Sequence, residues 1–263
     1  MLHQHAVQPR PMQEAVVFQI AALLALLGMG LAWRGVMTQY AGFYDLTLAW
    51  SHVLWGCVLG ALVASLEFQT LFIPYYELVI GGTDATQGPN LFVLLWFVAM
   101  HSAAAHLILR RTKVREASAQ TTSGWALGAA MGGMQGLFLS AQLLNANTAF
   151  DASHRWLGAA AFGLLLPRLE ATLTAWQGHL MLQGRRLGAV FRAAAWRMVL
   201  LTLAYFAFFQ PLIWLVAVVV LLSAEPRVGG WVWDGLSPQA KRALRRVRAE
   251  RAREMRNRER EEE

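Results

Sequence analysis

The sequence predicts an all-α protein, a polytopic bundle of about six transmembrane helices, and three observations carry this prediction. Of the 263 residues, 56% are apolar and only 15% are charged, whereas an ordinary soluble domain carries about 25% charged residues. The apolar residues gather in windows of about 20 or more, the length that a helix needs to cross a hydrocarbon core of about 30 Å. Tryptophans fall near the ends of these windows, where an indole can remain in the membrane interface.

Six windows meet the length requirement, and a helix in each would pair its own backbone polar groups within the lipid. They are residues 15–37, 46–66, 91–109, 122–144, 156–176 and 196–222. The N-terminal segment, residues 1–14, lacks the pattern of a cleavable signal peptide, so we expect the first window to persist as a helix. We expect the transmembrane bundle over residues 15–223 and a basic, charged cytoplasmic tail over residues 224–263.

Basic residues in the short connections predict the orientation of the bundle. One group lies between the third and fourth windows and another between the fifth and sixth, and both indicate a cytoplasmic connection. The first group is Arg110, Arg111, Lys113 and Arg115, and the second is Arg185, Arg186, Arg192 and Arg197. We therefore expect the N-terminus, residues 81–90 and the connection between the fourth and fifth windows on the outside.

The end of the chain does not fit one further crossing. Eleven Lys or Arg follow from Glu225 onward, and the charge rule keeps them in the cytoplasm, but one crossing from a cytoplasmic Arg197 would export them. Residues 196–222 are too few for two full crossings, and Pro211 lies near their middle. Three arrangements remain open: a Pro-kinked hairpin that enters and leaves on the cytoplasmic side, a single kinked span with an external tail, and a different distribution of spans.

The last residues, 237–263, predict a charged helix with Ser237 as its N-cap and Pro238 at its first helical position. Its apolar residues form only a thin stripe: Leu244, Val247 and Met255. The helix can be solvated and held by ion pairs four residues apart, adsorb to anionic lipid through its Arg face, or dock on a cytoplasmic protein. Because the basic residues lie in this tail and beside the apolar windows, we expect no nucleic-acid partner.

Glycines recur at helical spacing in two of the windows. Gly56 and Gly60 lie four residues apart in the second window, and Gly128, Gly132 and Gly136 continue the same spacing in the fourth. Faces of this kind let two transmembrane helices approach closely. They can serve packing within this chain or docking of another subunit, and the presence of two such faces favours a partner membrane protein.

Three histidines lie inside apolar windows, where a polar side chain is costly and a functional role is the first hypothesis. His52 and His106 are expected roughly 9 and 5 Å from the same membrane face, because the second and third windows run antiparallel. Two imidazoles at matching depth on facing helices can ligate a b-type haem, with His101 as an alternative second ligand. The other interpretation is structural, with each imidazole bonded to a nearby carbonyl or headgroup.

Charged side chains interrupt the fifth window directly after Pro167. Arg168 and Glu170 are two residues apart, so they diverge around the helix and pair poorly with each other. Arg168 can snorkel to the cytoplasmic face. Alternatively, it forms an intramembrane ion pair with Glu67 or Glu77, or lines a polar path for an ion or solute.

No motif of a phosphate-binding loop, a catalytic triad or a zinc protease is present, which favours a non-catalytic role. The single Cys57 excludes a disulfide framework within one chain, and no metal site is predicted. The leading hypothesis is an integral subunit, in the inner membrane of a bacterium, that assembles with other membrane proteins in a larger complex. The alternatives are a redox subunit that binds haem b and a small transporter of a solute or ion.

Overall fold

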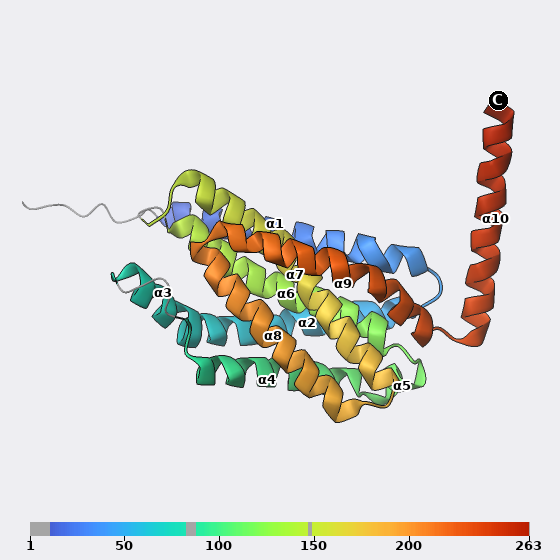
Figure 1. Ribbon diagram of the computed structural model, residues 1–263, viewed down its shortest axis with the longest axis horizontal. Helices are drawn as coiled ribbons and strands as arrows, with labels where there is room; N and C mark the ends of the chain where they lie inside the picture. The colour runs from blue at the N-terminus through green and yellow to red at the C-terminus, as the bar shows by residue number, and fades with distance from the viewer. Residues whose placement is uncertain (1–10, 83–87, 147–148, 263) are drawn as a thin grey trace, which may run out of the picture.

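The protein is described by a computed structural model over residues 11–82, 88–146 and 149–262. Every regular element in these ranges is a helix. Six of the helices are long and apolar enough to cross a membrane, and they run side by side along the long axis of the molecule (Figure 1). The predicted class, an all-α integral membrane protein, is therefore confirmed at the level of its helices.

The long helices begin after residues suited to that position. Asp45 and Asn90 are N-caps whose side chains accept hydrogen bonds from backbone N–H groups of the first turn. In chain order the helices are α1 (Pro11–Val36), α2 (Leu46–Glu67), α3 (Ile73–Ile80), α4 (Leu91–Leu109), α5 (Thr112–Glu116), α6 (Gln120–Asn145), α7 (Ala152–Leu182), α8 (Arg186–Phe209), α9 (Trp214–Gly235) and α10 (Pro238–Glu262). Three short turns extend or join them: η1 (Met37–Tyr40), η2 (Phe68–Phe72) and η3 (Pro211–Ile213).

Helix α6 is the centre of the bundle. Its most apolar stretch is 78% buried, against 39% or less in the other five candidate spans. α1, α2 and α7 pack on α6, α8 and α9 pack on α7, and α4 packs on α8. The outer faces of the bundle carry exposed large apolar side chains such as Leu54, Trp96 and Leu215, as expected for helices that lipid surrounds.

Both glycine faces are filled by packing within the chain. A Cβ added to Gly56 would lie 2.5 Å from the carbonyl oxygen of Leu127, and one added to Gly128 would lie 2.4 Å from that of Glu170. The other three glycines have similar close neighbours: Gly60 faces Met131, Gly132 faces Leu166, and Gly136 faces Phe162. These faces hold α2 and α7 against α6, so they are not free to dock another subunit.

Residues 196–222 are not a single span, because they belong to two helices that meet at Pro211, as in the predicted hairpin, but each helix extends beyond the window. α8 ends at Phe209, Gln210 leaves the helical conformation, and Pro211 begins the turn η3 that leads into α9. Proline has no backbone N–H and its ring obstructs the preceding turn, so a helix ends readily before it. The stretches Arg186–Phe209 and Pro211–Gly235 are each long and apolar enough to cross a membrane. The bundle also continues past residue 223, its predicted end, to Gly235.

The fifth window, residues 156–176, lies within α7 (Ala152–Leu182). α7 is long enough to cross a membrane, but it is not among the six helices that are also apolar enough. Its additional polar residues are buried against neighbouring helices, as Glu170, Thr174 and Gln177 are. α7 is therefore a long helix shielded from lipid over much of its surface.

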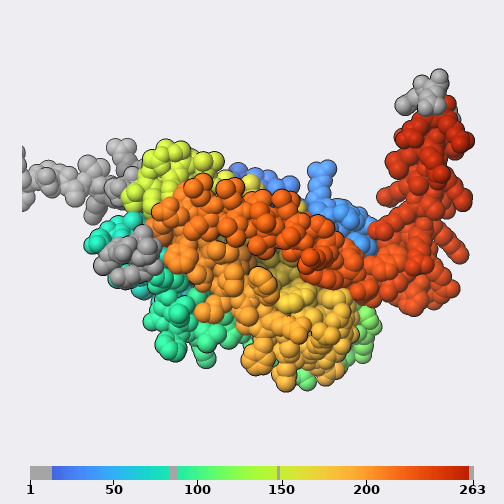
Figure 2. Space-filling model, in the orientation of Figure 1, coloured from blue at the N-terminus to red at the C-terminus, as the bar shows by residue number. Residues whose placement is uncertain are grey.

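The basic connections share one end of the bundle. α5, the turn between α7 and α8, and the start of α10 lie together at the right of Figure 1, whereas α3 and the turn between α8 and α9 lie at the left. A depression lined by residues from 42–45, 117–122 and 232–243 joins three connections at this basic end. α10 leaves there across the bundle axis and projects from the body of the molecule (Figure 2).

Candidate functional site

A buried arginine forms the first of two polar clusters inside the bundle. Arg197 on α8 is 1% exposed, and its Nε lies 3.0 Å from Oε2 of Glu170 on α7. Its Nη1 donates to Ser102 Oγ (2.7 Å) and Gln177 Oε1 (3.2 Å), and its Nη2 donates to Thr174 Oγ1 (2.7 Å). The guanidinium is thus enclosed by acceptors, which a charge removed from water requires.

Glu67 is the centre of the second cluster. It lies at the end of α2 and is 4% exposed. Its Oε1 accepts a hydrogen bond from the Tyr205 hydroxyl at 2.5 Å, and its Oε2 accepts one from Gln135 Nε2 at 3.1 Å. Among the residues that the structure describes, none forms an ion pair with Glu67. This carboxyl group therefore has neutral donors but no counter-ion in that part of the chain.

One turn of π-helix, η2, follows Glu67 directly. It precedes Pro74, which has no N–H to continue the regular backbone ladder, and within it the Thr70 hydroxyl donates to the Leu66 carbonyl oxygen at 2.7 Å. π-turns inside helices recur at functional sites, because they change which side chains face inward. Here Glu67 and Tyr75, before and after the turn, are both buried.

A small cavity separates the two clusters. Its polar lining consists of Glu67, Gln135, His101, Glu170 and Arg197, and its volume is about 10 Å³, close to the minimum that holds one water molecule. The buried Nε2 of His101 has no hydrogen-bond partner among the described residues. A second cavity of about 10 Å³ lies beside Glu67, Gln135 and the Tyr205 ring. Glu67 thus borders two spaces of about the size of one water molecule.

The surroundings of the clusters differ toward the two ends of the bundle. Toward the basic end, Gln177 Nε2 donates to the Ser102 carbonyl oxygen at 2.8 Å, and the first turn of α6 buries four further polar side chains. These are Gln120, Thr121, Thr122 and Ser123. Toward the other end, Tyr205 packs against aromatic rings, with centroids 5.0 Å from Phe72 and 6.2 Å from Tyr75.

Haem ligation by His52 and His106 stays a prediction. His52 Nδ1 lies 2.6 Å from the Leu48 carbonyl oxygen, and the buried face of α2 that carries His52 packs on α6. Of the five cavities described, only the small one beside Arg197 is lined by a histidine, His101, and neither His52 nor His106 borders any of them. A ligand as large as haem needs several hundred Å³, and the cavity lined by His101 has about 10 Å³.

Arg168 pairs with neither Glu67 nor Glu77, so this predicted ion pair is wrong. Its Nη2 lies 2.6 and 2.7 Å from the two carboxylate oxygens of Glu225 on α9. The two side chains are 31% and 17% exposed, so the pair lies near the surface of the bundle. Arg168 and Glu170 diverge around α7 as predicted, one toward Glu225 and the other toward Arg197.

Most of the first cluster is not predicted from the sequence, because the charge pattern places Arg197 in a cytoplasmic connection. The structure has this residue well inside α8, where an isolated Arg within a largely apolar stretch is the signal that could have revealed it. Tyr205, Gln135 and Ser102 carry no such signal, because their roles depend on helices that meet only in the folded bundle. Comparisons with protein-family models, curated proteins and solved structures find no match for this chain.

Proposed function

We propose that the chain is a small membrane transport protein in which Glu67 takes up and releases a proton as the proton crosses the bundle. The observation that carries this proposal is the position of Glu67 between two cavities of about 10 Å³, each with room for about one water molecule. A buried ionisable side chain in a membrane bundle is a functional site by default, and chains of such groups form proton relays.

The groups on either side of Glu67 can each both give and accept a proton. The Tyr205 hydroxyl, 2.5 Å from Oε1, does so on one side. On the other side, a water molecule in the small cavity would join the carboxyl group to the free Nε2 of His101. A proton that enters from one face neutralises the Glu67 carboxylate, and its departure toward the other face restores the charge.

The ion pair of Arg197 and Glu170 lines the small cavity beside Glu67 with polar groups that are held in place. Its charges cancel, and its hydrogen bonds to Ser102, Thr174 and Gln177 hold it in place. Buried polar side chains continue from it toward the basic end, whereas aromatic rings pack around Tyr205 toward the other end. This difference between the two ends supports a conformation in which aromatic side chains close the path of the proton at the end that carries α3.

Proton flux into liposomes that contain the purified protein and an internal pH-sensitive dye tests the proposal. Under an imposed membrane potential, we expect the wild-type protein to acidify the lumen faster than empty liposomes. Glu67→Gln keeps the size of the side chain but removes the titratable group, so its flux should fall at least tenfold. Glu225→Gln is the matched control, because it neutralises a half-buried carboxylate outside the clusters and should retain flux.

Two results would contradict the proposal. One is wild-type flux equal to that of empty liposomes, and the other is undiminished flux through Glu67→Gln. Equal gel-filtration volumes and helix content of the three proteins would exclude misfolding as the cause of any loss.

The exposed length of α10 supports a second candidate, an integral subunit of a larger complex. Leu244 is buried against the bundle beside Tyr40 and Trp233, but nearly all the residues from Arg248 to Arg260 are exposed. A basic helix that projects from the bundle (Figure 2) offers a surface to a cytoplasmic protein or to a neighbouring subunit.

Blue-native electrophoresis of mildly solubilised membranes tests this second candidate. The full chain should migrate in a larger assembly, and a chain that ends at Arg246 should migrate as a smaller species. Migration of the full chain alone, at its own mass of 29.2 kDa plus bound detergent, would count against it.

A further inference from the structure

A groove runs along the outside of the bundle between α8 and α9. The two helices separate from their turn at Gln210 and Pro211 and diverge toward the basic end, with α7 between them as the floor (Figure 1). The groove has a volume of about 380 Å³, within the usual range for small-molecule sites. Because its walls belong to candidate membrane spans, its mouth faces lipid.

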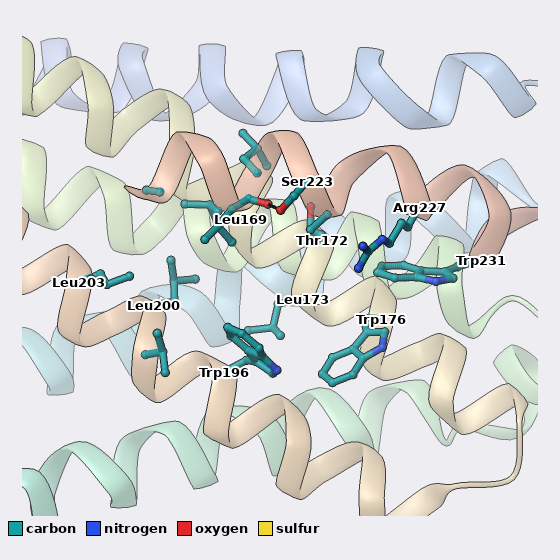
Figure 3. A pocket seen from close by; sticks show the side chains of 15 residues that line it. Leu169, Thr172, Leu173, Trp176, Trp196, Leu200, Leu203, Ser223, Arg227 and Trp231 are labelled. Atoms are coloured by element: carbon teal, nitrogen blue, oxygen red, sulfur yellow. Dashed lines mark hydrogen bonds between the residues drawn. The ribbon is translucent and has the colours of Figure 1, made fainter. Parts of the chain in front are cut away.

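The lining of the groove changes along its length. Near the turn between α8 and α9 it is aliphatic, with Leu203 on one wall and Leu221 on the other. Toward the basic end, the indoles of Trp176 and Trp231 and the guanidinium of Arg227 line it (Figure 3). Indoles prefer the interface between hydrocarbon and water. The groove therefore changes from apolar to polar in the same direction as a lipid molecule in the leaflet at the basic end, from its acyl chains to its headgroup.

Arg227 is the only charged side chain in the lining. It is exposed, it forms no ion pair with any residue in the described part of the chain, and it reaches into the groove beside Trp231 (Figure 3). It precedes Gly235, the end of α9, by eight residues, or about 12 Å along the helix. A cation at this depth needs a counter-ion or contact with headgroups.

We propose that this groove binds one anionic phospholipid from the leaflet at the basic end. The phosphate lies against Arg227, the indoles of Trp176 and Trp231 flank the glycerol region, and one acyl chain follows the aliphatic walls toward Leu203. Charge complementarity identifies the occupant, because a single unpaired cation favours an anionic headgroup over a zwitterionic one. An Arg near the membrane surface raises the binding constant for an anionic lipid about fivefold. The proposal does not depend on proton transfer at Glu67.

Native mass spectrometry of the purified full chain with equimolar phosphatidylglycerol and phosphatidylcholine tests the site. At one to two equivalents of lipid, we expect the first retained molecule to be phosphatidylglycerol, with a preference of about fivefold. Arg227→Gln should abolish this preference. Arg192→Gln is the matched control, because Arg192 is an exposed arginine of α8 that does not line the groove, and it should leave the preference unchanged.

A second variant locates the lipid. Leu200 lines the α8 wall, and Leu200→Trp fills part of the groove without a change of charge, so it should reduce retention of the first phosphatidylglycerol. Equal retention of the two lipids by the wild type, or an unchanged preference in Arg227→Gln, would overturn the proposal. If Leu200→Trp reduced retention of the lipid but Arg227→Gln left the preference for phosphatidylglycerol unchanged, the occupant would be a neutral amphiphile. This result would also overturn the proposal.

Discussion

Arg197 and Arg168 both lie within the helix bundle, but their surroundings differ. Arg197 is 1% exposed, and its pair with Glu170 is held by three further side chains. Arg168 is 31% exposed and has Glu225 as its only ion-pair partner among the described residues. Removal of one member of a buried pair leaves an uncompensated charge and costs about 3–5 kcal/mol. The cost falls as the charge that remains becomes more exposed.

We therefore predict that Arg197→Met lowers the free energy of unfolding by about 3–5 kcal/mol. Arg168→Met should lower it by less, because the Glu225 side chain that it leaves unpaired is 17% exposed, whereas the Glu170 side chain is 3% exposed. Unfolding in mixed micelles, followed by circular dichroism, measures both values. The double change Arg197→Met with Glu170→Leu should recover part of the loss, and equal losses for the two single variants would contradict this account.

The histidines illustrate what sequence can and cannot predict about single residues. The depth of His52 and His106 follows from their position along a helix, but the direction of each side chain around the helix axis depends on which neighbour that helix packs against. His52 shares the buried face of α2 with Gly56, and Gly56 meets Leu127 of α6. Matching depth alone therefore does not predict which way each imidazole points.

At the scale of helices, apolar windows predict spans well where a polar connection separates them. α2, α4 and α6 each contain one predicted window, and α1 contains all but the last residue of another. Apolar windows do not separate α8 from α9 within residues 196–222, because apolar side chains continue on both sides of the break at Gln210 and Pro211. The fifth window is shorter than α7 because Gln177 and His179, which are polar, are buried against neighbouring helices and not exposed to lipid.

The contact between α6 and α7 depends on close approach of their backbones. A Cβ added to Gly132 would lie 2.6 Å from the Leu166 carbonyl oxygen, whereas a Cβ added to Gly30 on α1 meets nothing within 4 Å. We predict that Gly132→Ala separates the helices and lowers the free energy of unfolding by roughly 1–3 kcal/mol. Gly30→Ala is the matched control and should lower it by nothing measurable.

The same unfolding measurement in mixed micelles compares these two glycine variants. A Gly132→Ala protein as stable as the Gly30→Ala protein would show that the backbones of α6 and α7 do not approach as closely as described.

At the scale of the whole molecule, the turn between α8 and α9 returns the chain to the basic end. The connections that carry Arg110 to Arg115, those around Arg185, and the start of α10 consequently lie together (Figure 1). This arrangement resolves the charge conflict that a single last crossing creates. It also agrees with the tendency of Lys and Arg to remain on the cytoplasmic side.

Labelling of single cysteines with a membrane-impermeant maleimide tests this topology. In a Cys57→Ala background, Ala152→Cys introduces a thiol at the start of α7, and Arg253→Cys introduces one on α10. We predict that intact cells label Ala152→Cys and that Arg253→Cys reacts only after permeabilisation, because the distribution of Lys and Arg predicts that the basic end faces the cytoplasm. Reaction of both variants in intact cells would contradict the predicted topology.

Composition predicts the class of the whole molecule, because lipid exposure acts on every outward residue of every span. It does not predict the polar clusters, since Glu67, Ser102, Gln135, Glu170 and Arg197 come from five different helices. Three of these residues are noticeable in the sequence as charges within or at the end of apolar windows: Glu67, Glu170 and Arg197. Their partners become evident only when the packing of α2, α4, α6, α7 and α8 is known.

We propose that Glu67 exchanges a proton within the bundle. Infrared difference spectroscopy of the protein in lipid, recorded between about pH 6 and alkaline pH so that exposed carboxyl groups with a pKa of about 4 stay ionised, observes this through the carbonyl stretch of a protonated carboxyl group. We predict such a band for the wild type and for Glu225→Gln, and its loss in Glu67→Gln. The same band in all three proteins, or in none, would contradict the claim.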